Sequence, residues 1–148
     1  MNIKNEKGFT AVDIGLAMLV IMIFTVIITS ISYNVYLSST EAKRTAVALN
    51  YSVDVFEHIG LLDYDDVTAN SGEIFDIEAL NGFVQDGATK VGNTETITGH
   101  IGTFNFELKI EDYNGEDIIK ILTLKITFPV SRDNTEKIEI QRLKVKNA

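Results

Sequence analysis

An uncharged apolar segment constrains this chain more than any other feature of its sequence. Eighteen consecutive residues, Ile14 to Ile31, carry no charged side chain. As a helix they would rise about 27 Å, close to the roughly 30 Å hydrocarbon core of a bilayer. The helix of a soluble protein shows a polar side chain every three or four residues, whereas here the interruptions are only Gly15, Thr25, Thr29 and Ser30. The segment therefore predicts a membrane-spanning helix.

The residues after this segment remain compatible with a helix. From Tyr33 to about Ile59 there is neither proline nor glycine, and Gly60 follows as a residue able to take the left-handed conformation that ends many helices. We predict one continuous helix from Phe9 to Ile59, about 75 Å long. Apolar residues recur at steps of three and four and predict one stripe that packs on a sheet: Ala42, Ala46, Leu49, Val53 and Phe56.

The pattern changes from helical to alternating in the second half of the chain. Residues 61–100 are rich in Gly, Asn, Asp and Thr, and they predict a long connection with one or two short elements. Residues 104–110 and 122–128 alternate apolar with polar side chains, which predicts two strands. Asn114-Gly115 lies between them and favours the type I′ turn of a tight hairpin.

A third strand is expected over residues 136–145. Its alternation slips between Ile140 and Leu143, which indicates a bulge. Its basic side chains are interpreted as an ordinary solvated face: Lys137, Arg142, Lys144 and Lys146. The predicted fold class is α+β, with a long N-terminal helix packed on a C-terminal antiparallel sheet of three or four strands.

Composition excludes several classes of function. The net charge is −8, and acidity dominates after the apolar segment, so a surface that binds nucleic acid through clustered Lys and Arg is not expected. There is no cysteine, which rules out disulfides and thiolate metal sites. Neither a glycine-rich phosphate loop nor a nucleophile elbow is present. We therefore expect no catalytic residues, no cofactor and no enzyme.

The residues that precede the apolar segment carry the most specific motif. Residues 7–13 read KGFTAVD, which resembles the cleavage and methylation site of type IV prepilins and type II secretion pseudopilins. The resemblance implies that a prepilin peptidase cuts after Gly8 and methylates the new amino group of Phe9. Glycine suits a scissile position because it leaves the backbone accessible to the protease.

The chain departs from this family at its acidic position, where Asp13 stands in place of the usual Glu. In the family this carboxylate pairs with the free amine of a neighbouring subunit's first residue, here Phe9. A charge near the bilayer interior costs about 2.5 to 3.5 kcal/mol on insertion scales, which favours a partner for it. The alternative is that Asp13 only stabilises the first turn through the helix dipole.

A weaker resemblance extends through residues 41–49, 55–59 and 62–67, which are similar to the corresponding region of minor pilins and pseudopilins. The apolar helix also lacks the proline that many major pilins carry. The resemblance implies a leader (1–8), a transmembrane and assembly half of the helix (9–32), an amphipathic half (33–60) and a globular β head (61–148).

The same resemblance implies where the protein acts and with what. The chain would lie in the cytoplasmic (inner) membrane as a single-pass protein with its head outside the cytoplasm, and then enter a surface pilus or pseudopilus. Its expected partners are prepilin peptidase, other pilin or pseudopilin subunits, membrane lipid and the assembly platform.

Two other interpretations fit the hydrophobic profile. One is a single-pass anchored binding domain that never polymerises. The other is a secreted β protein whose first 32 residues are a signal peptide, with small residues at 30–32. A signal peptide, however, requires neither Gly-Phe-Thr before its apolar region nor an acidic residue inside it. The mature N-terminus, at Phe9, Tyr33 or Met1, separates the three.

An acidic cluster after the predicted helix is a candidate calcium site: Asp63, Asp65 and Asp66. It lacks the glycine and the distal glutamate of an EF-hand loop, so we interpret it as a solvated turn. The two histidines, His58 and His100, lie far apart in the sequence and do not predict a metal pair. No metal site is predicted.

Overall fold

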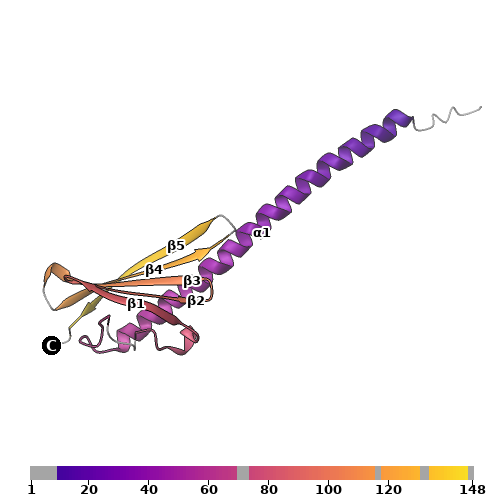
Figure 1. Cartoon of the computed structure of the whole chain (residues 1–148). Coiled ribbons are helices and arrows are strands. Elements are labelled where there is room, and N and C mark those ends of the chain that lie inside the picture. The colour runs from indigo at the N-terminus through magenta and orange to yellow at the C-terminus, as the bar shows by residue number, and fades with distance from the viewer. Residues whose placement is uncertain (1–9, 70–73, 116–117, 131–133, 147–148) are drawn as a thin grey trace, which may run out of the picture. The chain divides into compact units, whose positions relative to one another are not determined.

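The computed structural model describes residues 10–69, 74–115, 118–130 and 134–146 (Figure 1). One helix, α1, runs from Ala11 to Leu61. Five strands and two short 3-10 helices, η1 (Glu78–Leu80) and η2 (Tyr113–Gly115), follow it. The chain divides into two compact units, one ending at Ser39 and one beginning at Thr40. The predicted α+β class and the long N-terminal helix are confirmed.

In the first unit α1 is exposed at every residue from Ala11 to Ser39 except Leu37, which is half-buried. Large apolar side chains dominate this surface; Leu16, for example, is 66% exposed and Met22 is 68% exposed. The helix continues through this stretch because no proline interrupts it between Ile14 and Thr40.

The second unit contains a single antiparallel sheet in the order β1-β2-β3-β4-β5, visible as labelled neighbours in Figure 1. The strands are β1 (Val84–Val91), β2 (Thr94–Ile101), β3 (Phe104–Asp112), β4 (Ile119–Pro129) and β5 (Thr135–Val145). The sheet thus has five strands, one more than the upper limit of the three or four predicted. The error lies in residues 61–100, where the last part of the predicted long connection, from Val84 on, is the hairpin β1–β2.

The hairpin turns also differ from the prediction. β1–β2 and β2–β3 are joined by two-residue turns that begin with Gly92 (φ 61°) and Gly102 (φ 57°). Glycine reaches these positive φ values without steric cost. Asn114 does take the left-handed conformation expected of it (φ 54°). However, it lies in a six-residue connection between β3 and β4, so the predicted tight two-residue turn there is wrong.

The core lies between the second part of α1 and one face of the sheet. Its helix residues include Ala48, Val55, Phe56 and Ile59, each at most 5% exposed. The sheet contributes alternate residues of its two central strands, which are buried because the side-chain period of a strand is two: Phe106, Leu108, Ile110, Leu122, Leu124, Ile126 and Phe128.

The predicted apolar stripe of α1 does not pack on the sheet. Of its five residues only Phe56 is buried, whereas Leu49 and Val53 are 43% and 51% exposed and both alanines are also exposed. The helix turns a different face inward, one that includes Ser52. This hydroxyl is buried without an energetic penalty because it donates a hydrogen bond to the carbonyl oxygen of Ala48 at 2.9 Å.

β5 pairs with β4 in an unbroken register from Thr135 to Val145, so the predicted bulge is absent. The apolar pattern slips because the helix-facing positions after Ile140 hold Arg142 and Lys144, while Leu143 points to the opposite face. Lys144 is half-buried, so the prediction of a solvated basic face is wrong for this residue, whereas Arg142 is exposed although its position faces the helix.

Both side chains bind the end of α1. Arg142 donates to the carbonyl oxygen of Phe56 at 3.2 Å. The Nζ of Lys144 donates to the carbonyl oxygens of Ile59, Gly60 and Leu62 at 3.1, 3.0 and 2.7 Å. Ile59 and Gly60 belong to the last turn of α1, whose carbonyls have no partner within the helix, so the Lys144 ammonium satisfies them and interacts favourably with the helix dipole. Gly60 is itself helical, so the predicted glycine cap is replaced by a lysine from β5.

Candidate functional site

The start of α1 is closed by a reciprocal pair of residues. The carboxylate of Asp13 accepts from the backbone N–H of Thr10 at 3.0 Å and from its hydroxyl at 2.7 Å. The hydroxyl oxygen of Thr10 in turn accepts from the N–H of Asp13 at 3.3 Å. This is the geometry of a capping box, with aspartate in the position that glutamate or glutamine usually takes. Asp13 thus has a local role in the first turn.

Gly8 and Phe9, the residues predicted for cleavage and methylation, lie outside the described residues. Asp13 is the one predicted assembly residue within them. Both of the hydrogen bonds that it accepts from Thr10 use Oδ2, and a carboxylate offers about four acceptor positions on its two oxygens. The capping box therefore leaves acceptor capacity on this side chain for a further donor.

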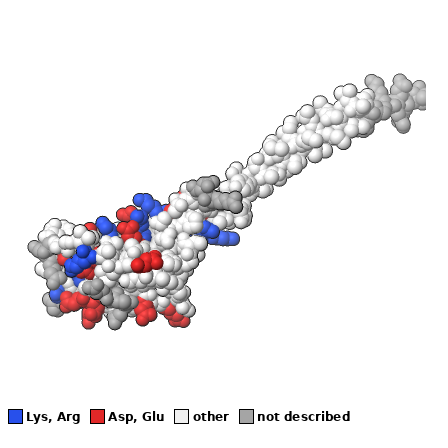
Figure 2. All heavy atoms as spheres, viewed as in Figure 1, with Lys and Arg blue, Asp and Glu red and all other residues white. Residues whose placement is uncertain are grey.

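After Asp13 the helix surface carries no charge up to Thr40, and Figure 2 shows this stretch without a blue or red side chain. Its mean hydropathy over eighteen residues reaches 2.7, and none of that stretch is buried. By length and composition α1 could span a membrane. A contiguous apolar surface of this size requires lipid or protein to cover it.

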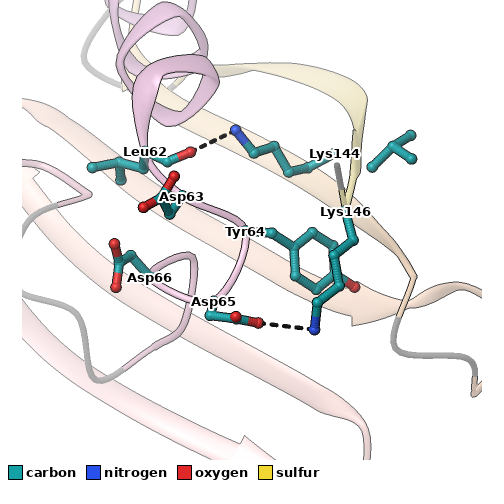
Figure 3. Close-up of a pocket in the computed structure, with 8 residues that line it drawn as sticks. Leu62, Asp63, Tyr64, Asp65, Asp66, Lys144 and Lys146 are labelled. Carbon is teal, nitrogen blue, oxygen red and sulfur yellow. Dashed lines mark hydrogen bonds and ion pairs between the residues drawn. The ribbon is translucent and has the colours of Figure 1, made fainter. Parts of the chain in front are cut away.

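A pocket of about 290 Å³ lies beside the end of α1, between the acidic turn and the end of β5 (Figure 3). Asp63, Asp65 and Asp66 are exposed, as expected of a solvated turn. Asp65 forms an ion pair with Lys146 at 3.2 Å. The Nζ of Lys144 binds the carbonyl oxygen of Leu62 on the same side. Two ammonium groups thus line the space next to the three carboxylates.

A buried lysine that the sequence did not reveal binds the backbone of the acidic turn. Lys120 on β4 is only 8% exposed, and its Nζ donates to the carbonyl oxygens of Tyr64 and Val67 at 3.0 and 2.9 Å. The same ammonium lies 4.4 Å from the centroid of the Tyr64 ring, within range of a cation–π interaction. Lys120, Lys144 and Lys146 together fix the segment that follows α1.

Glu95 also holds the segment that follows α1, through a carboxylate instead of an ammonium group. It occupies a helix-facing position of β2 opposite Ile110, and its carboxylate accepts from Lys90 Nζ at 2.6 Å and from the backbone N–H of Ala69 at 2.5 Å. Burial opposes ionisation of this side chain, but these two hydrogen bonds outweigh burial and hold the pKa of Glu95 below its usual value.

The histidines do not form a joint site. His100 on β2 contacts Asp86 at 3.0 Å, whereas His58 belongs to the last turn of α1. Among the described residues, no group of three His, Asp or Glu side chains is close enough to hold a metal ion.

Comparison of the chain with protein-family models, with curated proteins and with solved structures gives no match. The polar contacts described above stabilise the fold. Cations close a helix end, a carboxylate anchors a loop, and one helix presents an uncharged surface. The candidate functional element is therefore the N-terminal helix with its capped start, rather than a pocket.

Proposed function

We propose that this chain is a structural subunit, of the minor pilin or pseudopilin type, of a type IV pilus or a type II secretion-like filament. One observation carries the proposal: α1 exposes an uncharged apolar surface from Ile14 to beyond Ile31. That surface directly follows the residues KGFTAVD, with their resemblance to a prepilin processing site. A membrane covers such a surface before assembly, and helices of neighbouring subunits cover it afterwards.

In this proposal prepilin peptidase removes residues 1–8 and methylates the amino group of Phe9. The subunit waits in the cytoplasmic membrane with its head outside the cytoplasm, and the assembly platform then transfers it into the filament. Asp13 pairs with the amine of Phe9 on the next subunit. An unpaired carboxylate is costly in a low-dielectric helix bundle, so this pair would favour one register.

Mass spectrometry of the mature N-terminus tests the proposal. The full chain, co-expressed with an active prepilin peptidase, should begin at Phe9 and carry one added methyl group. Gly8→Leu should leave the precursor uncut in the membrane. An intact Met1 beside a peptidase that cleaves a known substrate would contradict the proposal, and a chain beginning at Tyr33 would indicate a secreted protein.

Recovery in sheared filaments separates a subunit from a non-polymerising anchored domain. A subunit should co-purify with the filaments of a cell that assembles them. A chain that is processed at Phe9 but stays entirely in the membrane fraction would instead be the anchored binding domain.

A further inference from the structure

The exposed apolar residues of α1 in the second unit form a seam that the chain itself leaves uncovered. The seam consists of Ala42, Ala46, Leu49 and Val53, all of them exposed. It lies beside the helix face that packs on the sheet, which includes Ala48 and Ser52. A pocket of about 270 Å³ borders it, between Val53 and Phe56 on the helix and Ile140 to Arg142 on β5.

The spacing of the seam is that of a two-helix interface. Its residues are separated by four, three and four positions, which is the a/d pattern of a heptad repeat. Val53 then occupies an a position and Leu49 a d position. A β-branched residue at a with leucine at d favours two parallel helices over higher assemblies.

We propose that two membrane-anchored copies of this chain pair through this seam, side by side, parallel and in register. The inference rests on the membrane anchoring in the proposed function. Each copy's seam follows its anchor by the same number of residues, so one bilayer presents identical seams in the same orientation. Confinement to a membrane also raises the effective concentration of one copy near another, which a seam of four residues requires.

The charges that border the seam fit a parallel second copy. Lys43 and Glu57 are exposed on the helix beyond the seam, so the charge runs from positive to negative along it. β5 runs beside the helix in the same direction, because Arg44 binds the carbonyl oxygen of Pro129, the partner of Thr135, while Arg142 binds that of Phe56. Its net charge runs the opposite way: the first half holds Glu136 and Glu139 with Lys137 between them, and the second half holds Arg142 and Lys144. A parallel neighbour therefore places Lys43 near the acidic end of β5 and Glu57 near the basic end.

Disulfide cross-linking tests the pairing, because the full chain has no cysteine of its own. Val53→Cys places a thiol in the seam. Val47→Cys is the matched control, since Val47 is also exposed (39%) but points about 120° away around the helix. After mild oxidation of native membranes, Val53→Cys should give severalfold more covalent dimer than Val47→Cys. Equal yields from the two variants would overturn the proposal.

The register is tested by mixing two variants in one membrane. In-register pairing joins Val53→Cys to Val53→Cys and Ala42→Cys to Ala42→Cys. A preferred disulfide between Ala42→Cys and Val53→Cys would show a staggered contact and would overturn the in-register pair. Leu49→Glu should abolish the dimer formed by Val53→Cys, whereas Val47→Glu, at an exposed position that points away from the seam, should largely preserve it.

Two further measurements on the same samples separate the pairing from the proposed function: whether the chain is in the membrane fraction, and at which residue it begins. A chain that is embedded in the membrane and processed at Phe9, yet gives no seam-specific dimer, overturns the pairing and leaves the proposed function standing. A chain absent from the membrane overturns both.

Discussion

The ring of Phe83 lies against the backbone of Gly99, so close that a β-carbon on Gly99 would come within 2.2 Å of the ring's Cζ. The carbonyl oxygen of Val84 would lie only 2.6 Å from that β-carbon. Phe83 also stacks on Phe75, with ring centroids 4.4 Å apart. The glycine therefore lets an aromatic cluster cover the end of β2, where any side chain would displace both a ring and a backbone oxygen.

Gly99→Ala should lower the free energy of unfolding by about 1 to 3 kcal/mol, the usual cost of overpacking. Gly87→Ala is the control on the neighbouring strand, because its β-carbon would meet Thr98 at an ordinary 3.5 Å. Urea denaturation of a fragment that begins at Tyr33 measures both. Equal stability of the two variants would mean that Phe83 moves aside freely.

Phe56→Ala should destabilise the same fragment by about 3 to 5 kcal/mol, since this ring is 5% exposed and anchors α1 on the sheet. Val53→Ala, one turn earlier on the exposed seam, should change stability by no more than about 0.5 kcal/mol. We expect the fragment itself to be folded and monomeric, because among the described residues the core begins at Ala48 and the seam is too short to pair without a membrane. Sedimentation equilibrium checks the monomer; a loss under 1 kcal/mol for Phe56→Ala would contradict the anchor role.

Stability should fall in acid through Glu95. The folded-state pKa of this carboxyl lies below its unfolded value, so its ionised form stabilises the fold above the unfolded pKa, and this contribution is lost as pH falls through the folded pKa. Glu95→Gln should therefore be less stable than the parent at pH 7, with the difference shrinking below about pH 4.5. Glu139→Gln, on the exposed face of β5, is the control. A difference that is constant between pH 7 and pH 3 would exclude this linkage.

Asp13 variants separate capping from assembly. If Asp13 pairs with the amine of Phe9 on a neighbour, Asp13→Ala and Asp13→Asn should insert and be cleaved but be largely lost from sheared filaments, while Asp13→Glu should be tolerated. Thr10→Ala is the decisive control, because it removes the capping partner seen in the structure and keeps the charge. If Thr10→Ala fails in filaments as badly as Asp13→Ala, the role of Asp13 is capping alone.

The elements that could be predicted from the sequence are those with a strong apolar signal. The uncharged run indicated α1, strict alternation indicated the strands β3 and β4, and an alternation that breaks after Ile140 still indicated β5. β1 carries no such signal because it is an edge strand with a bulge between Gln85 and Gly87, and almost all of its residues are exposed. Gly92 and Gly102, each opening a two-residue turn, were the signals that could have revealed β1 and β2.

Periodicity alone could not choose between the two faces of α1. Leu49 and Val53 give the exposed face an apolar stripe of its own, and the buried face combines the large Val55, Phe56 and Ile59 with the small Ala48 and Ser52. A close approach of helix and sheet selects small side chains, and the hydroxyl of Ser52 is satisfied within the helix. In the same way, Lys144 resembles a surface lysine in the sequence, because the carbonyls that it binds belong to a helix end more than eighty residues earlier.

Because these contacts join residues so far apart in the sequence, the head can be completed only after β5, the last strand, has been synthesised. During synthesis the carbonyls at the end of α1 wait for a partner until β5 has been made, because Arg142 and Lys144 lie 82 to 86 residues after the groups that they bind. Contacts of such high sequence separation form late and slowly. A chain that stops before β5 would keep its apolar helix but have an unfinished helix end and an open sheet edge, so proteases that degrade incomplete proteins would recognise it.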